Sequence, residues 1–304
     1  MKGQQDHQGY VPVSRTAAPT HRRGVAGGRL RRVSGIALYT LLSFYAFCNL
    51  YPLFWMVSNS FKNNQEIFVR NVFGLPRIWR FENYIKAWQS FNIFLYFKNS
   101  MIVATATVVI TLMLSIMFAY ATARMSWKLS SIARIYMSIG MFVPVQVIFI
   151  PLVLLIRDFH LSNSYLALIV PYVAFQLSFC SIVFYGFFRT LPPELEEAAA
   201  IDGANVYVTF YRIILPLVKP AIATLAIFVF LFSWNEFAIA LIMISNNSLK
   251  TLPLGLLLFQ GQFATDWGAM GASLALASIP TIVVYLLFGN EVEKALTVGS
   301  AVKG

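Results

Sequence analysis

Several apolar runs in this 304-residue chain reach about twenty residues, the length of helix that crosses the hydrocarbon core of a membrane. Composition agrees, because only 12% of the residues are charged, whereas soluble domains carry about 25%. We therefore predict an all-α polytopic membrane protein. Its six transmembrane helices are expected at about residues 33–57, 99–121, 135–156, 165–188, 221–245 and 269–288.

The distribution of basic residues predicts which side of the membrane each loop faces. Six spans place both termini on one side, and 15 of the 23 Lys and Arg residues lie on that side. Cytoplasmic loops carry an excess of Lys and Arg, so both termini are predicted to be cytoplasmic. Because the positive charges cluster at span ends, the net charge of +11 does not indicate nucleic-acid binding.

The chain divides into a short tail and one long domain. Residues 1–32 are polar and basic, and we predict a disordered cytoplasmic tail there. Residues 33–304 form the predicted six-span domain, in which the loop at 190–219 and the tail at 289–304 face the cytoplasm.

The loop at 190–219 has the pattern of two short helices joined by a sharp turn. Pro193 suits the first turn of a helix, and Gly203 suits a left-handed stop. Asn205 can cap a second helix, which Pro216 is expected to end. We expect its apolar residues to lack a buried face and to meet a separate protein; they are Leu195, Ala198, Ala199, Val208, Phe210, Tyr211 and Ile214.

This loop resembles a known motif. Glu197-Ala198-Ala199, then Gly203, then Ile213–Pro216 resemble the EAA loop in the membrane subunits of bacterial ABC importers. In that family the loop forms a coupling helix that docks on a cytoplasmic ATPase. An amphipathic helix lying on the inner leaflet is the alternative. The resemblance implies these ATPase-coupling residues: Glu197, Ala198, Ala199, Asp202, Gly203 and Pro216.

From about residue 36 onward the chain is similar to one branch of that family, the carbohydrate-type permeases of maltose-type importers. Trp234–Phe237 resembles the fifth-span motif of the branch, and Gly299–Gly304 resembles its usual ending. The resemblance implies import of a sugar or oligosaccharide across the bacterial cytoplasmic membrane. It also implies a tail that contacts the ATPase through Val302, Lys303 and Gly304.

The same resemblance implies several partners. They are a second related permease, a cytoplasmic ABC ATPase dimer that binds ATP and Mg, and an extracytoplasmic sugar-binding protein, all surrounded by membrane lipid. The resemblance implies that the chain itself binds no cofactor and is no enzyme. Because the chain contains no G-x-x-x-x-G-K-[ST] motif, we expect that it is not itself a P-loop ATPase. We identify neither a catalytic constellation nor a metal-binding spacing in it.

Four polar residues in predicted spans are candidates for the substrate path. A carboxylate such as Glu236 costs a few kcal/mol within a membrane unless it meets protein or water. Asn235 and Glu236 can line the path, or Glu236 can bond to a neighbouring helix; both interpretations remain open. The amides of Gln146 and Gln176 suit sugar hydroxyls, but they can equally link helices.

Prolines and small residues predict how the spans bend and pack. Kinks are expected at Pro144, Pro151, Pro171 and Pro280. Close helix packing, including with a second membrane subunit, is expected at Gly268, Gly271, Ala272 and Ser273.

Two other transport functions compete with the importer of sugars. An ion-coupled secondary sugar transporter requires intramembrane charges or broken helix pairs in related halves, and strict dependence on an ATPase would exclude it. An ABC importer of a polyol phosphate, such as a glycerol phosphodiester, would favour Arg or Lys inside the spans. A membrane scaffold without transport activity would leave the prolines and Glu236 unexplained.

Overall fold

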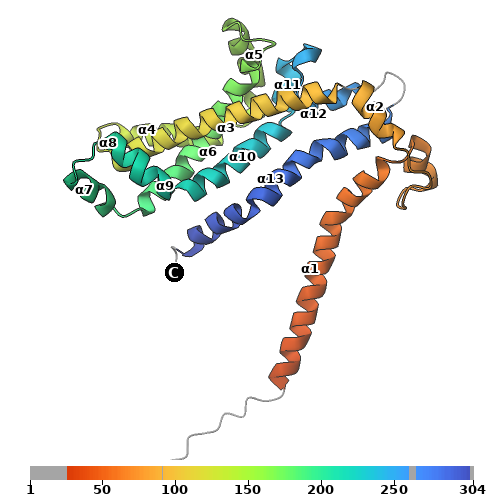
Figure 1. The fold of residues 1–304 in the computed structure, drawn as a ribbon, viewed down its shortest axis with the longest axis horizontal. Helices are drawn as coiled ribbons and strands as arrows, with labels where there is room; N and C mark the ends of the chain where they lie inside the picture. Colours follow the sequence, from red (N-terminus) through yellow and green to blue (C-terminus); the bar gives the residue numbers. More distant parts are fainter. Residues whose placement is uncertain (1–25, 91, 260–264, 302–304) are drawn as a thin grey trace, which may run out of the picture. The chain divides into compact units, whose positions relative to one another are not determined.

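The computed structural model describes residues 26–90, 92–259 and 265–301 (Figure 1). Every regular element in these ranges is helical, and none of the described residues forms a strand element, which confirms the all-α prediction. The chain divides into two compact units, Met1–Leu53 and Phe54–Gly304, and the boundary falls inside the first helix.

The first helix, α1, spans Ala26–Asn59 and begins before the predicted start at residue 33. Pro52 lies inside it without ending it. Large apolar side chains along the helix are exposed, as expected for a surface that lipid covers. The rest of the predicted tail, residues 1–25, lies outside the described residues.

Four helices are long and apolar enough to cross a membrane: Gly35–Asn59 in α1, α3 (Ile93–Arg124), α6 (Leu166–Thr190) and Trp267–Leu287 in α13. Two bent helix pairs raise the number of candidate spans to six within the described residues. α3 begins earlier than the predicted residue 99, and α13 (Trp267–Ala301) continues as one helix through the region expected to be a tail.

The third apolar run is a bent pair rather than one straight helix. It comprises α4 (Ser130–Ile139), η2 (Gly140–Phe142), η3 (Val145–Ile148) and α5 (Phe149–Asp158), with an angle of 93° at the break. Pro144 occupies the break, because proline lacks an N–H and disfavours helix in the preceding residue. The kink predicted at Pro144 is confirmed, whereas Pro171 and Pro280 lie inside continuous helices.

The fifth apolar run is interrupted as well. α10 (Lys219–Asn235) ends at Asn235, and α11 (Ala238–Met243) follows after a non-helical step at Glu236 and Phe237. The prediction of one continuous span at 221–245 is therefore wrong. The chain then forms η5 (Asn247–Leu249), α12 (Leu252–Gly255) and η6 (Leu256–Phe259).

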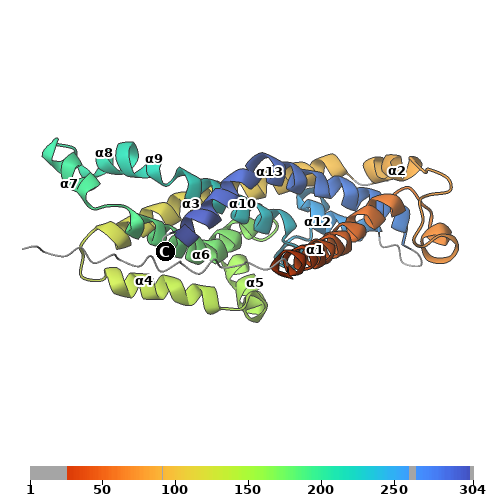
Figure 2. The ribbon, with the colours of Figure 1, turned by 90° about the horizontal axis from the view of Figure 1, so that it is seen from below.

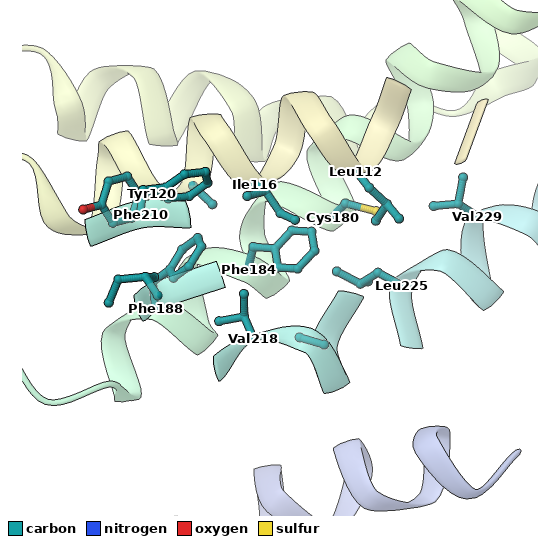
Figure 3. Close-up of a cluster of buried hydrophobic side chains, with 13 residues drawn as sticks. Leu112, Ile116, Tyr120, Cys180, Phe184, Phe188, Phe210, Val218, Leu225 and Val229 are labelled. Atoms are coloured by element: carbon teal, nitrogen blue, oxygen red, sulfur yellow. The ribbon is translucent and has the colours of Figure 1, made fainter. Parts of the chain in front are cut away.

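Three helices of the second unit form its core. α3 lies along α6 and α10, and α13 packs beside α10 (Figures 1 and 2). Figure 3 shows side chains from α3, α6 and α10 pointing toward one another in the largest apolar cluster. This cluster includes Leu112, Ile116, Cys180, Phe184, Phe188, Leu225 and Val229.

At the end of the bundle where α3 begins, two buried polar residues hold the neighbouring loop. Asn99 donates to the carbonyls of Ser248 and Lys250, each at 2.9 Å, and accepts from the Tyr165 hydroxyl at 2.7 Å. Ser100 Oγ accepts from the Leu252 N–H at 2.8 Å. These bonds tie α3 to the segment before α12 and to the start of α6.

Candidate functional site

The loop at 190–219 forms two short helical pieces, as predicted. The first is α7 (Glu194–Ile201), and the second comprises α8 (Val206–Val208), the π-helical turn η4 (Thr209–Ile214) and α9 (Leu215–Leu217). Together they form a helical hairpin at the end of the bundle where α3 finishes, and we call this hairpin the EAA-like loop (Figure 1).

Gly203 makes the sharp turn between the two pieces. Its φ of 78° is a left-handed conformation that L side chains rarely adopt. Ala204 N–H donates to the Ala199 carbonyl at 2.9 Å and Gly203 N–H donates to the Ala200 carbonyl at 3.1 Å, which is the Schellman pattern that ends a helix. An added Cβ would meet nothing within 4 Å, so the backbone conformation, not space, requires glycine here.

Asn205 caps the second piece as predicted, because its Oδ1 accepts from the Val208 N–H at 2.9 Å. The expectation that Pro216 ends this piece is wrong. Pro216 lies in the first turn of α9, where a missing N–H is tolerated, and the chain bends by 73° only after Leu217.

The expectation that the apolar residues of the loop lack a buried face is wrong for three of them. Ala199, Phe210 and Ile214 are buried, and the last two belong to the same apolar cluster as α3, α6 and α10. The remaining apolar surface faces outward, with Ile201 86%, Tyr207 76% and Tyr211 60% exposed. The loop is therefore anchored on one face and open on the other.

An ion pair that the sequence analysis missed fastens α7 to α3. Glu196 Oε2 lies 2.9 Å from Arg124 Nε, and Glu196 Oε1 accepts from the Tyr120 hydroxyl at 2.9 Å. Arg124 also donates to the carbonyls of Leu191 and Pro192, each at 3.2 Å. We call Tyr120, Arg124 and Glu196 the α3–α7 clamp. The only sequence signal for this clamp is that a basic residue, Arg124, follows a predicted span and an acidic residue, Glu196, lies in the loop.

The structure places the predicted coupling residues on both faces of the loop. Glu197, Ala198, Asp202, Gly203 and Pro216 are exposed, whereas Ala199 is buried. Five of the six can thus be reached by another protein, and their coupling role stays a prediction.

Both carboxylate oxygens of Glu236 accept hydrogen bonds. Glu236 accepts from the Tyr172 hydroxyl of α6 at 2.5 Å, and from the N–H groups of Ile239 at 2.7 Å and Ala240 at 3.1 Å. Acidic side chains stabilise helix N-termini, so Glu236 explains why α11 begins here and α10 stops. Of the two interpretations left open, the structure displays the bond to a neighbouring helix.

The other three path candidates are not linked to Glu236 by any hydrogen bond among the described residues. Asn235 is exposed and donates to the Leu231 carbonyl at 2.8 Å. Gln146 is exposed in η3 and Gln176 is half-buried in α6. Their part in a substrate path stays a prediction, and the predicted tail contact at Val302–Gly304 lies outside the described residues.

The loop between α1 and α3 contains a second polar cluster that was not predicted in detail. It includes η1 (Glu66–Arg70) and α2 (Glu82–Ser90). Lys62 is buried and donates to the Asn71 carbonyl at 2.9 Å, and burial lowers the pKa of its amine. Burial alone would raise the pKa of Glu66, but the Arg77 N–H at 2.6 Å, Asn71 and Lys62 outweigh it and lower that pKa.

The stripe of small residues on α13 packs within the chain. A Cβ on Gly268 would lie 2.3 Å from the Lys62 carbonyl oxygen, and one on Gly271 would lie 3.3 Å from Ser60 Cα. Ala272 and Ser273 are fully buried. Close packing is confirmed, and its partner is the turn after α1. In the part of the chain that the structure describes, no group of three or more His, Cys, Asp or Glu side chains gathers as for a metal.

Comparisons with known proteins agree with this architecture. Residues 111–297 match the family model "Binding-protein-dependent transport system inner membrane component". The chain is 37% identical over 268 residues to the "Probable ABC transporter permease protein YurM" of Bacillus subtilis strain 168, covering 88% of each chain. It is 34% identical over 272 residues to the "Diacetylchitobiose uptake system permease protein NgcG" of Streptomyces coelicolor, covering 89% of each.

One solved structure has the same fold. It is the crystal structure of a bacterial ABC transporter involved in the import of the acidic polysaccharide alginate, with a TM-score of 0.75 and 22% sequence identity. The similarity covers 90% of this chain and 99% of that one.

Proposed function

Because this chain belongs to the family of binding-protein-dependent transport system inner membrane components, we propose that it is the permease subunit of an ATP-driven importer of a sugar or oligosaccharide. Relatives named as permeases, including one for diacetylchitobiose uptake, support this function. The chain would form half of the translocation path, beside a second related permease, and receive substrate from an extracytoplasmic binding protein.

The six-span topology is part of the proposal. The four continuous helices supply four spans, the bent pair at Pro144 supplies another, and α10, which follows the bend at Val218, supplies the last. With both termini in the cytoplasm, the excess of Lys and Arg lies on the cytoplasmic side, and the EAA-like loop lies there too.

The single observation that carries the coupling role is the two-sided EAA-like loop. Its inner face is part of the protein core, so a force on the loop reaches α3, α6 and α10 directly. Its outer face presents Ile201, Tyr207 and Tyr211 together with the acidic Glu197 and Asp202. We infer that this outer face docks on an ATPase that binds ATP and Mg, and that this chain holds neither.

Co-purification from the native membrane, followed by mass spectrometry, tests this function. Wild type is expected to bring a P-loop ATPase and a second permease. Gly203→Val should selectively lose the ATPase, since a β-branched residue cannot hold the left-handed turn. Gly203→Asn is the matched control, because Asn tolerates that conformation and should keep the ATPase.

Two results would contradict the proposal. The first is wild-type protein that co-purifies with no ATPase under conditions that preserve complexes, which would favour an ion-coupled carrier. The second comes from transport assays with the reconstituted complex: uptake of a glycerol phosphodiester in place of any sugar would replace the sugar assignment.

A further inference from the structure

A groove of about 290 Å³ lies between α3, α4 and α6, and neither the EAA-like loop nor Glu236 lines it. α4 lies along α6 in this region (Figure 2). The groove is mostly apolar, but five polar side chains line it: Thr122, Arg134, Ser138, Ser181 and Tyr185. The hydroxyls of Thr122 and Ser138 bond to carbonyls of their own helices, which leaves Arg134, Ser181 and Tyr185 to be considered. Its apolar walls are formed by Phe118, Ile135, Ile139, Phe142 and Ile182.

Arg134 is a cation without a carboxylate partner among the described residues. Its guanidinium donates to the Tyr185 hydroxyl at 2.5 Å and its central carbon lies 4.8 Å from the centre of that ring. An arginine has five N–H donors, and most of them are left for another acceptor. Because anionic lipid headgroups attract basic side chains near a membrane surface, an arginine near the start of α4 favours an anion as its partner.

Ser181 gives an independent sign of a missing partner. Its side chain is 1% exposed and lines the groove, yet its Oγ makes no hydrogen bond with any residue that the structure describes. Buried hydroxyls nearly always have a partner, because an unmade hydrogen bond costs free energy. A group that accepts a hydrogen bond in the groove would satisfy Ser181 and Arg134 together.

The outer end of the groove, at Arg134 and Tyr185, fits the headgroup layer of a membrane. α3 ends at Arg124, α4 begins at Ser130 and α6 ends at Thr190, so all three helices finish at the same end of the bundle. At 1.5 Å per residue, Arg134 and Tyr185 lie about 6–8 Å inside those ends. Arg and Tyr are typical of this level, where the polar tip meets lipid headgroups.

We propose that this groove binds the phosphate group of an anionic phospholipid. The phosphate pairs with the Arg134 guanidinium and accepts from the Ser181 hydroxyl, while the acyl chains lie against the apolar wall. That wall is open to such chains, since Ile135, Ile139 and Phe142 are all exposed. The apolar wall favours a lipid over free phosphate, which would gain nothing from it.

Native mass spectrometry of the purified full chain tests the site with three probes. They are phosphatidylglycerol, phosphatidylcholine and inorganic phosphate. Phosphatidylglycerol is expected to bind most tightly, and Arg134→Gln should weaken its binding about fivefold, as for loss of one basic residue at a membrane surface. Arg189→Gln is the matched control, because it removes an exposed arginine at the same end of α6 and should change binding less than about twofold.

Ser181→Ala separates binding from folding. It should weaken phosphatidylglycerol binding by about twofold or more without lowering the unfolding temperature, since the hydroxyl has no partner inside the protein. Equal binding of the two phospholipids, or unchanged binding by Arg134→Gln, would overturn the proposal. Displacement of the lipid by millimolar inorganic phosphate would overturn it in favour of a free anion.

Discussion

Arg124 at the end of α3 and Glu196 in the first turn of α7 form an ion pair at 2.9 Å, and their side chains are only 9% and 23% exposed. The pair links a predicted transmembrane helix directly to the EAA-like loop. Since Arg124 also holds the carbonyls of Leu191 and Pro192, it fixes both the entry to α7 and its first turn. A displacement of the loop should therefore move α3.

We expect Glu196→Ala to uncouple the loop from α3. Loss of a partly buried ion pair leaves Arg124 and Tyr120 without their shared partner and should cost about 1–3 kcal/mol. The ratio of sugar transported to ATP hydrolysed in the reconstituted complex should fall. Glu194→Ala is the control, because Glu194 is exposed on the same turn; an equal fall in both variants would refute a specific role for the α3–α7 clamp.

Asn205→Ala should destabilise the second piece of the EAA-like loop by about 1 kcal/mol, the usual cost of a lost N-cap. Limited proteolysis of the loop measures this as faster cleavage. Asn205→Asp keeps an acceptor for the Val208 N–H, so the protease should cleave this variant at the wild-type rate. If both variants resist cleavage like wild type, the cap does not hold the loop.

Tyr172→Phe distinguishes the two interpretations of Glu236. The substitution removes one hydrogen bond to the carboxylate and leaves the bonds to α11 intact. If Glu236 only joins helices, the free energy of unfolding should fall by about 1–3 kcal/mol, which lowers the unfolding temperature, while the KM for sugar stays constant. A KM that rises with little loss of stability would instead place Glu236 in the substrate path. Asn235→Ala is the control, because Asn235 is the exposed neighbour of Glu236.

Gly268→Ala should be far more damaging than Gly271→Ala. The added methyl group would lie 2.3 Å from the backbone oxygen of Lys62, which cannot move aside as a flexible side chain can, whereas at Gly271 it would lie 3.3 Å from Ser60. Overpacking of this kind costs about 1–3 kcal/mol. Thermal unfolding of the two variants in detergent checks the order, and the reverse order would contradict the packing described for α13.

Stability should fall in acid partly through Glu66. Its pKa in the folded protein is below the ordinary glutamate value of 4.5, so the carboxylate stabilises the fold above that value and loses this contribution as the pH falls through the lower folded pKa. Glu66→Gln should therefore be less stable at neutral pH and show a weaker pH dependence below about pH 5. Identical acid unfolding profiles for wild type and variant would exclude Glu66 as a source of the loss of stability in acid.

Local features of the chain were predictable because neighbouring residues determine them. The left-handed turn at Gly203 and the cap at Asn205 depend on residues within one helical turn, and both were read from sequence. Long apolar runs likewise predict helices, although their ends differ by several residues. The break at Pro144 follows from the chemistry of a single residue.

Features that join distant parts of the chain were not predictable in the same way. Glu236 interrupts the fifth apolar run and bonds to Tyr172 of α6, and nothing near Glu236 in sequence indicates this distant partner. The buried face of Phe210 depends on where α3 and α6 lie. The groove around Arg134 needs three helices to meet before its polar groups converge.

The fit of Gly268 and Gly271 against the turn after α1 has a practical consequence. This stripe of small residues is already used inside the chain, so in the proposed complex we expect it to contribute little to the choice of a partner permease. A hybrid transporter, in which another permease replaces the proposed partner, is therefore expected to leave this part of α13 unchanged. Engineering of such pairs can begin from other surfaces.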